Sequence, residues 1–340
     1  MTGFRDGRWT VVALLAGLLG FVWLAVPAWV ALTRFDVLRA GHPAYPVALA
    51  VSVLIGAVLL VLVARTRLRG ASQGRHPARR WLGVAAVLAG VLATALVPGG
   101  LAWLRPFAAS PIAVEAMRGT GAVEVTQDSS SITLTPIART PMAPPAASAA
   151  GSATAGARTG LIFQPGARVD PRAYVPLLAE VAARGHPIVI VKQPFDLAFT
   201  ALAAPFGVMD ARPQVHRWVV AGHSLGAVAA ARAAAPAATP RDPRIVGLAL
   251  WAGYPDDSTT VRDLPVLSVY GTADGLATPA KVDASRRLLP SDTAFVAVDG
   301  GVHAYFGDYG EQPGDGTPTI DRTSAQRIIA DATASFLGRN

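Results

Sequence analysis

The sequence predicts an α/β domain with a mostly parallel, doubly wound sheet, preceded by three helices that cross a membrane. Long uncharged apolar stretches fill the first third, short apolar strands alternate with helices in the rest, and a Gly-x-Ser-x-Gly pentapeptide lies at 222–226. Of the 340 residues, 52% are hydrophobic and only 15% are charged, which is too apolar for an ordinary soluble protein. We expect a membrane region over residues 1–108 and an α/β domain over residues 109–340.

Three stretches in the membrane region contain no Asp, Glu, Lys or Arg, and they lie at 10–32, 45–64 and 81–104. Each can cross about 30 Å of hydrocarbon at about 1.5 Å per residue. The first is longer than the core of a signal peptide, so we expect it to be retained. Pro27 and the Pro-Gly-Gly at 98–100 are expected to kink or shorten two spans. The absence of charge within the spans argues against a transporter or a proton relay.

The distribution of arginine predicts the orientation of these spans. Six arginines lie between the second and third stretches, but only two between the first and second. The positive-inside rule therefore places the N-terminus in the cytoplasm and the α/β domain outside it. Nucleic-acid binding by the arginine cluster is the alternative, but such clusters beside membrane spans more often set topology. We expect a multi-pass protein of the cell membrane whose partners include the lipid bilayer and no nucleic acid.

The second part of the chain shows the pattern of an α/β fold. Alternating residues at 122–126 and 131–135 predict a β-hairpin, and residues from about 138 to 158, rich in Ala, Pro, Ser and Gly, predict a flexible connection. Further strands are expected at 159–163, 187–191, 215–221, 245–251, 266–270 and 294–298, and helices at 170–183, 227–233, 279–289 and 324–337. Nearly continuous apolar strands that alternate with helices imply a parallel sheet covered on both faces.

The pentapeptide Gly222-His223-Ser224-Leu225-Gly226 lies between a predicted strand and a predicted helix. This is the context of a nucleophile elbow, in which glycines on both sides of a serine permit a very tight turn. The start of the following helix would supply free N–H groups for an oxyanion. A glycine-rich turn before an alanine-rich helix is the plainer interpretation, so the residues further along the chain decide between the two.

Two further polar residues follow predicted strands, as Ser224 does. Asp274 follows the strand at 266–270, and His303 follows the strand at 294–298. The carboxyl ends of parallel strands share one edge of the sheet, where ligands bind. Of the six histidines, only His303 lies after Ser224.

With the elbow, the acid and the histidine in the order Ser224, Asp274, His303, the chain resembles the α/β-hydrolase family over roughly residues 120–338. The resemblance implies acyl transfer through a Ser-His-Asp triad. Asp256 and Asp257 follow the preceding strand, where some members keep their acid, and Asp299 lies close to His303 in the sequence. We favour Asp274 over these three.

The resemblance also implies an oxyanion hole formed by two backbone N–H groups. One is that of Leu225, and the other aligns with Ala167, although this chain has Pro-Gly where the family has His-Gly. The short segment between the strands at 245–251 and 266–270 leaves no room for a cap domain. The chain therefore looks most like the small cap-less members, of the dienelactone-hydrolase-like and esterase-like kind.

Other polar residues of the α/β domain lie outside the expected triad and oxyanion hole. Lys192 and Arg168 could bind an anionic substrate group, but a surface position is the preferred interpretation, and His223 is expected only to pack. Asp308 and Asp315 lie among glycines as in a calcium loop, but their spacing does not match an EF-hand, so we expect a loop that supports His303. The chain has no cysteine, which excludes disulfides, thiolate metal sites and a cysteine nucleophile. We expect no cofactor and no metal.

The sequence thus favours a membrane-anchored serine hydrolase that cleaves a carboxylic ester, a thioester or a lipid ester, with a small-molecule or lipid substrate. An acyltransferase with the same triad is one alternative. An inactive binding or sensor module on a membrane anchor is the other.

Overall fold

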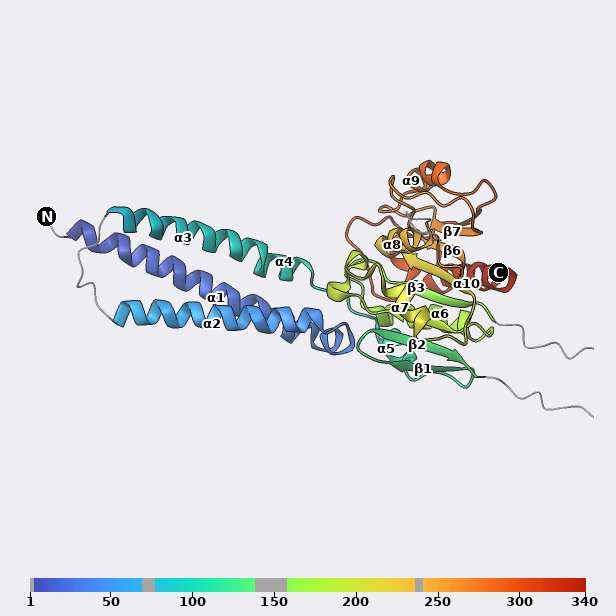
Figure 1. Ribbon diagram of the computed structural model, residues 1–340, viewed down its shortest axis with the longest axis horizontal. Helices are drawn as coiled ribbons and strands as arrows, with labels where there is room; N and C mark the ends of the chain where they lie inside the picture. Colours follow the sequence, from blue (N-terminus) through green and yellow to red (C-terminus); the bar gives the residue numbers. More distant parts are fainter. Residues whose placement is uncertain (1–2, 69–76, 138–157, 236–240) are drawn as a thin grey trace, which may run out of the picture. The chain divides into compact units, whose positions relative to one another are not determined.

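The computed structural model describes residues 3–68, 77–137, 158–235 and 241–340 (Figure 1). The chain divides into two compact units, Met1–Arg105 and Pro106–Asn340. Residues 138–157, which make up nearly all of the predicted flexible connection, lie outside the described residues.

The described residues of the first unit form four helices: α1 (Gly3–Ala40), α2 (Ala44–Leu68), α3 (Pro77–Leu96) and α4 (Pro98–Trp103). Three helical stretches are long and apolar enough to cross a membrane, over Leu14–Ala40, Ala44–Arg65 and Ala85–Trp103. Helix α1 continues through Pro27, and the residue with non-helical angles inside it is Arg34. Pro98 begins the short helix α4, because proline fits the first turn of a helix but not its interior.

Small residues allow α1 and α2 to pack closely. A Cβ atom on Gly56 would lie 2.9 Å from Cβ of Trp23 and 3.0 Å from the carbonyl oxygen of Gly20. The indole N–H of Trp23 donates to the hydroxyl of Thr94 on α3 at 2.7 Å. Many large apolar side chains on these helices remain exposed, among them Leu18, Phe21, Leu54 and Leu88. Helices with small residues at their contacts and apolar side chains facing outward are suited to lipid.

The second unit is built on one eight-stranded sheet with the order β1-β2-β4-β3-β5-β6-β7-β8. The strands are β1 (Val123–Gln127), β2 (Ser131–Pro136), β3 (Gly160–Gln164), β4 (Ile188–Val191), β5 (Trp218–His223), β6 (Ile245–Trp251), β7 (Val266–Gly271) and β8 (Ala294–Val298). Strand β2 pairs antiparallel with both β1 and β4, and every later pairing is parallel. The predicted hairpin and the mostly parallel sheet are confirmed.

Helices cover both faces of this sheet, as the apolar strands predict. The helices of this unit are α5 (Pro111–Ala116), α6 (Val175–Ala182), α7 (Ala204–Asp210), α8 (Leu225–Ala234), α9 (Pro279–Ala284) and α10 (Arg322–Arg339). One core packs α6 and α10 against side chains such as Leu161 and Phe163. The other packs α7 and α8 against Ile162 and Val220. Alternate residues of β3 thus enter different cores, since successive side chains of a strand point to opposite faces.

Three predicted elements differ from the structure by more than two residues at one end or in the type of helix. The strand expected from residue 215 begins at Trp218, because Val215 instead closes a turn by donating its N–H to Arg212. The helix expected over 170–183 is a 3₁₀ turn, Pro171–Tyr174, followed by α6. The helix expected over 279–289 becomes a 3₁₀ turn from Ser285. The pattern of apolar residues marks these segments but does not distinguish the two helix types.

Substitution of Gly226 by alanine tests the close backbone contact between α8 and the end of β3. An added Cβ would collide with the carbonyl oxygen of Gln164 and lie 2.5 Å from that of Pro165. We expect Gly226→Ala to lower the free energy of unfolding by about 1–3 kcal/mol, measured by denaturant titration of the full chain in detergent. In Gly207→Ala, a control on α7, the Cβ has nothing within 4 Å, and stability should rise by up to about 1 kcal/mol. Equal stability of Gly226→Ala and wild type would contradict the packing described.

Candidate functional site

Ser224 occupies a strained turn between β5, which ends at His223, and α8, which begins at Leu225. Its backbone has φ 54° and ψ −119°, a conformation that residues other than glycine rarely adopt. Such strain persists only where the surroundings enforce it, and it gathers at functional sites. The strand–turn–helix context predicted for the pentapeptide is therefore present.

Glycines explain how the backbone can turn so tightly at Ser224. A Cβ on Gly222 would collide with the carbonyl of Gly226 and lie 2.7 Å from the backbone nitrogen of Ala227. Gly253, which follows β6, would place a Cβ 2.7 Å from the carbonyl oxygen of Ser224. The two flanking glycines were expected from the sequence. Gly253 was not, because its role depends on the parallel pairing of β5 with β6.

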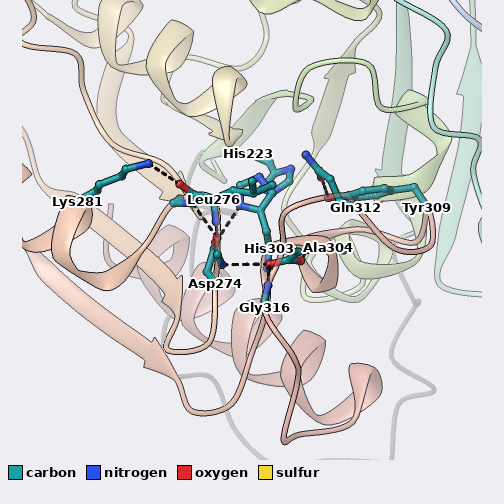
Figure 2. Close-up of polar contacts among 12 residues, drawn as sticks. His223, Asp274, Leu276, Lys281, His303, Ala304, Tyr309, Gln312 and Gly316 are labelled. Carbon is teal, nitrogen blue, oxygen red and sulfur yellow. Dashed lines mark hydrogen bonds and ion pairs between the residues drawn. The ribbon is translucent and has the colours of Figure 1, made fainter. Parts of the chain in front are cut away.

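His303 and Asp274 form a buried hydrogen-bonded pair on the loops that follow β8 and β7 (Figure 2). Nδ1 of His303 lies 2.8 Å from Oδ2 of Asp274, and the two side chains are 1% and 0% exposed. The other carboxylate oxygen of Asp274 accepts from the N–H groups of Leu276 at 2.8 Å and Ala277 at 2.7 Å. These bonds fix the carboxylate, and through it they fix the tilt of the imidazole ring.

The second ring nitrogen of His303, Nε2, is buried and has no hydrogen-bond partner among the described residues. Ser224 is partly exposed at the same carboxyl edge of the sheet. No hydrogen bond joins its hydroxyl to His303 within the described parts of the chain. The predicted contact between serine and histidine therefore remains a prediction, since such bonds often tighten only when substrate binds.

The other candidate acids are engaged elsewhere. The Asp256 carboxylate pairs with Arg232 and accepts from Ser258 and Thr259. Asp257 is exposed and pairs with Arg287, and Asp299 is exposed in the turn after β8. Of the four acids considered from the sequence, Asp274 is the one that contacts His303.

Asp315 joins the loop of the acid to the loop of the histidine. Its Oδ1 accepts from the N–H groups of His303 at 3.0 Å and Gly275 at 3.3 Å, and its Oδ2 accepts from the N–H of Ala304 at 2.8 Å. One carboxylate therefore positions the backbone on both sides of the Asp274–His303 pair. This is the supporting loop that the sequence predicts around Asp315. Within the described residues, no group of three or more His, Asp or Glu side chains could hold a metal ion.

Two backbone N–H groups in the turns after β3 and β5 have no hydrogen-bond partner among the described residues. Leu225 is the first residue of α8, so its N–H has no carbonyl partner within the helix. In the loop after β3, the N–H of Gly166 donates to the hydroxyl of Tyr174 and that of Arg168 donates to the carbonyl of Asp196. The N–H of Ala167, between them, has no partner in the segments that the structure describes. Leu225 and Ala167 are the two donors predicted for an oxyanion hole.

His223 lies at the centre of a buried aromatic group beside the site. Its ring is 4.5 Å from that of His303 and stacks on Phe306 at 5.7 Å, measured between centroids. Its Nδ1 lies 2.9 Å from the hydroxyl of Tyr174, which accepts from Gly166 and so keeps its own proton for Nδ1. Burial, and next the nearby His303, hold the pKa of His223 well below its ordinary value. The packing role expected for His223 is present, and Tyr174 was not foreseen.

The preferred interpretation of Lys192, a surface lysine, is wrong. Lys192 is only 4% exposed, and its ammonium group donates to Oε1 of Gln127 and the carbonyl of Asp128 in the β1–β2 hairpin. It therefore ties the hairpin to the end of β4. Arg168 is in a left-handed conformation, with φ 62°, and its guanidinium lies 5.1 Å from the centroid of the Phe107 ring.

Comparison with known proteins agrees with this architecture. Residues 160–327 match the model of the alpha/beta hydrolase family. No curated protein sequence matches the chain.

Among solved structures, the chain is similar to a thermostable esterase from Pseudomonas putida, with 14% identity, a TM-score of 0.45, and coverage of 67% of this chain and 88% of that one. A thermophilic esterase from Thermogutta terrifontis has 13% identity and a TM-score of 0.44, with coverage of 65% and 93%. Mouse alpha/beta hydrolase domain-containing protein 10 has 11% identity and a TM-score of 0.43, with coverage of 64% and 99%.

The depressed pKa of His223 predicts a loss of stability in acid. Below a pH of about 6.5 the unfolded chain binds a proton at His223 and the folded chain does not. The free energy of unfolding therefore has its full value above that pH and falls as the pH decreases below it. One such group contributes a slope of up to about 1.4 kcal/mol per pH unit. His223→Gln should flatten the decline in unfolding free energy between pH 6.5 and 5, measured in detergent. His216→Gln, at an exposed site, is the control and should keep the wild-type slope, and identical slopes for all three proteins would rule the account out.

Proposed function

Because the C-terminal domain belongs to the alpha/beta hydrolase family, we propose that it is a serine hydrolase that cleaves carboxylic esters through Ser224, His303 and Asp274. Thioesters and lipid esters fall within the same chemistry. The observation that carries the proposal is the buried Asp274–His303 pair, at the sheet edge that also carries the strained Ser224.

The reaction begins when the Ser224 hydroxyl attacks the ester carbonyl. Nε2 of His303 accepts the hydroxyl proton, which its lack of another partner allows. Asp274 holds the proton on Nδ1 and stabilises the imidazolium that forms. The carbonyl oxygen becomes an oxyanion that the N–H groups of Leu225 and Ala167 stabilise.

Collapse of this intermediate breaks the bond to the leaving alcohol, which takes the proton from His303. An acyl group then remains on Ser224. A water molecule attacks the acyl carbon while His303 accepts its proton, and the acid product leaves as the proton returns to Ser224. Every proton removed is returned, so the reaction requires no cofactor.

The N-terminal unit supports a membrane location for this activity. Its three apolar helical stretches have the length of membrane spans. Arg65 at the end of the second stretch and five arginines between the second and the third favour a cytoplasmic position for that segment. The proposed enzyme is thus anchored in the cell membrane, with its hydrolase domain on the extracytoplasmic side.

Reaction with a fluorophosphonate probe tests the nucleophile. We expect covalent labelling of the full chain in detergent at Ser224, located by peptide mass spectrometry. Ser224→Ala should abolish labelling and lower kcat for a p-nitrophenyl ester by at least about 10⁴-fold, because removal of the nucleophile stops acyl-enzyme formation. Ser291→Ala, at an exposed turn, is the matched control and should be labelled normally. Folded wild-type protein that the probe does not label would refute the proposed function.

The chain contains no cysteine, so a single introduced cysteine reports topology. We expect Asp292→Cys, on the hydrolase domain, to react with a membrane-impermeant maleimide on intact cells. Ser72→Cys, in the arginine-rich segment, should react only after the membrane is permeabilised. The reverse pattern would show that the positive-inside argument fails for this protein.

A further inference from the structure

Two glutamine side chains are buried beside the site without hydrogen-bond partners. Gln164 ends β3 and is 0% exposed, and Gln193 follows β4 and is 1% exposed. In the described residues, neither the amide nitrogen nor the amide oxygen of either side chain has a partner. Buried amide groups are nearly always hydrogen-bonded, because a buried polar group without a partner has lost its hydrogen bonds to water and gained none in return. Two such amides on neighbouring strands therefore require an explanation.

A buried carboxyl group lies three residues after Gln193. Asp196 is 6% exposed, and across the described ranges its side chain makes no hydrogen bond or ion pair. Burial, and to a lesser extent the charge of Asp170, raises the pKa of Asp196 well above its ordinary value, which favours the uncharged acid. An uncharged carboxyl group offers a donor and an acceptor, as a primary amide does.

Backbone contacts place these residues close to the reacting groups. Gln164 pairs with Gly222, two residues before Ser224, and its carbonyl is the group that a side chain on Gly226 would strike. The N–H of Asp196 donates to the carbonyl of Gln193 at 3.0 Å. The carbonyl of Asp196 accepts from the N–H of Arg168 at 2.7 Å, which joins this turn to the loop that carries Ala167.

Backbone strain marks the same place. In the described chain, five residues other than glycine have positive φ: Arg168, Phe195, Asp196, Ser224 and Ala252. Each follows the carboxyl end of a parallel strand, β3, β4, β5 or β6. Phe195 and Asp196 are consecutive, with φ of 57° and 51°, although such a conformation costs about 1–3 kcal/mol per residue. The turn after β4 thus combines strain with unsatisfied polar groups, which is costly for a segment that serves only the fold.

We propose that Gln164, Gln193 and Asp196 form a polar subsite for the acyl part of the substrate, so that the preferred esters carry a hydroxyl or amide group on the acyl chain. This rests on the proposed function. In the sheet, β3 and β4 lie on one side of β5, and β7 and β8, which position Asp274 and His303, lie on the other. The alcohol leaves on the imidazole side, where it is protonated, and the acyl chain extends over β3 and β4.

Two esters with the same leaving group and chain length provide the test: the p-nitrophenyl esters of butyric acid and of 3-hydroxybutyric acid. For the full chain in detergent, we expect kcat/KM to favour the hydroxylated ester by at least about tenfold. Only this ester has a hydroxyl group that can form hydrogen bonds with the polar side chains of the subsite. Gln193→Met and Gln164→Met, which keep the side-chain length, should each reduce this ratio by about tenfold. Gln214→Met, at an exposed position, is the matched control and should keep the ratio.

The wild-type ratio alone decides the proposal if a variant does not fold. A ratio near one, or in favour of butyrate, overturns it, as does an unchanged ratio in folded Gln193→Met and Gln164→Met. These results differ from failure of the proposed function. In that case neither ester is hydrolysed and the fluorophosphonate probe leaves Ser224 unlabelled, whereas failure of the subsite alone leaves Ser224 labelled and both esters hydrolysed without preference.

Discussion

The geometry of the site depends on one constraint, the close approach of backbone segments at the carboxyl end of β5. Ser224 adopts a left-handed conformation, and Gly222, Gly226 and Gly253 leave the space that this turn needs. The same contact brings the first turn of α8 against the end of β3, and so brings the N–H of Leu225 to the loop that carries Ala167. A serine on an ordinary turn would have neither donor beside it, because an ordinary turn does not let strand and helix approach so closely.

The other half of the site depends on loops rather than on strain. Asp274 and His303 lie on loops that are nearly thirty residues apart in the sequence, and the Asp315 carboxylate bonds to backbone N–H groups of both. The hydrogen bond from His303 to Asp274 thus forms between segments that are already joined. His223, at the end of β5, packs against the ring of His303. Because the pKa of His223 is low, this residue adds no positive charge beside the base His303 near neutral pH. The proposed reaction requires this arrangement, since a base that is not fixed would transfer protons inefficiently.

Much of this arrangement could be predicted because each residue follows a strand that periodicity identifies. Ser224, Asp274 and His303 come after apolar runs, and parallel strands end at one edge. The pairing of Lys192 with the β1–β2 hairpin could not be predicted, because it depends on β2 lying beside β4. Neither could the contact between Tyr174 and His223, which are 49 residues apart. The turn after β4 was also beyond prediction, since two consecutive left-handed residues without glycine contradict local propensity.

A crystal structure of the chain after reaction with an ethyl p-nitrophenyl alkylphosphonate, from which Ser224 would displace p-nitrophenolate, tests the central claim most directly. The account predicts phosphorus bonded to Oγ of Ser224, a phosphoryl oxygen within about 3 Å of the N–H groups of Leu225 and Ala167, and Nε2 of His303 within hydrogen-bond distance of an oxygen on phosphorus. Phosphorus on another residue would contradict the account, as would a Ser224 adduct whose oxygen points away from both N–H groups.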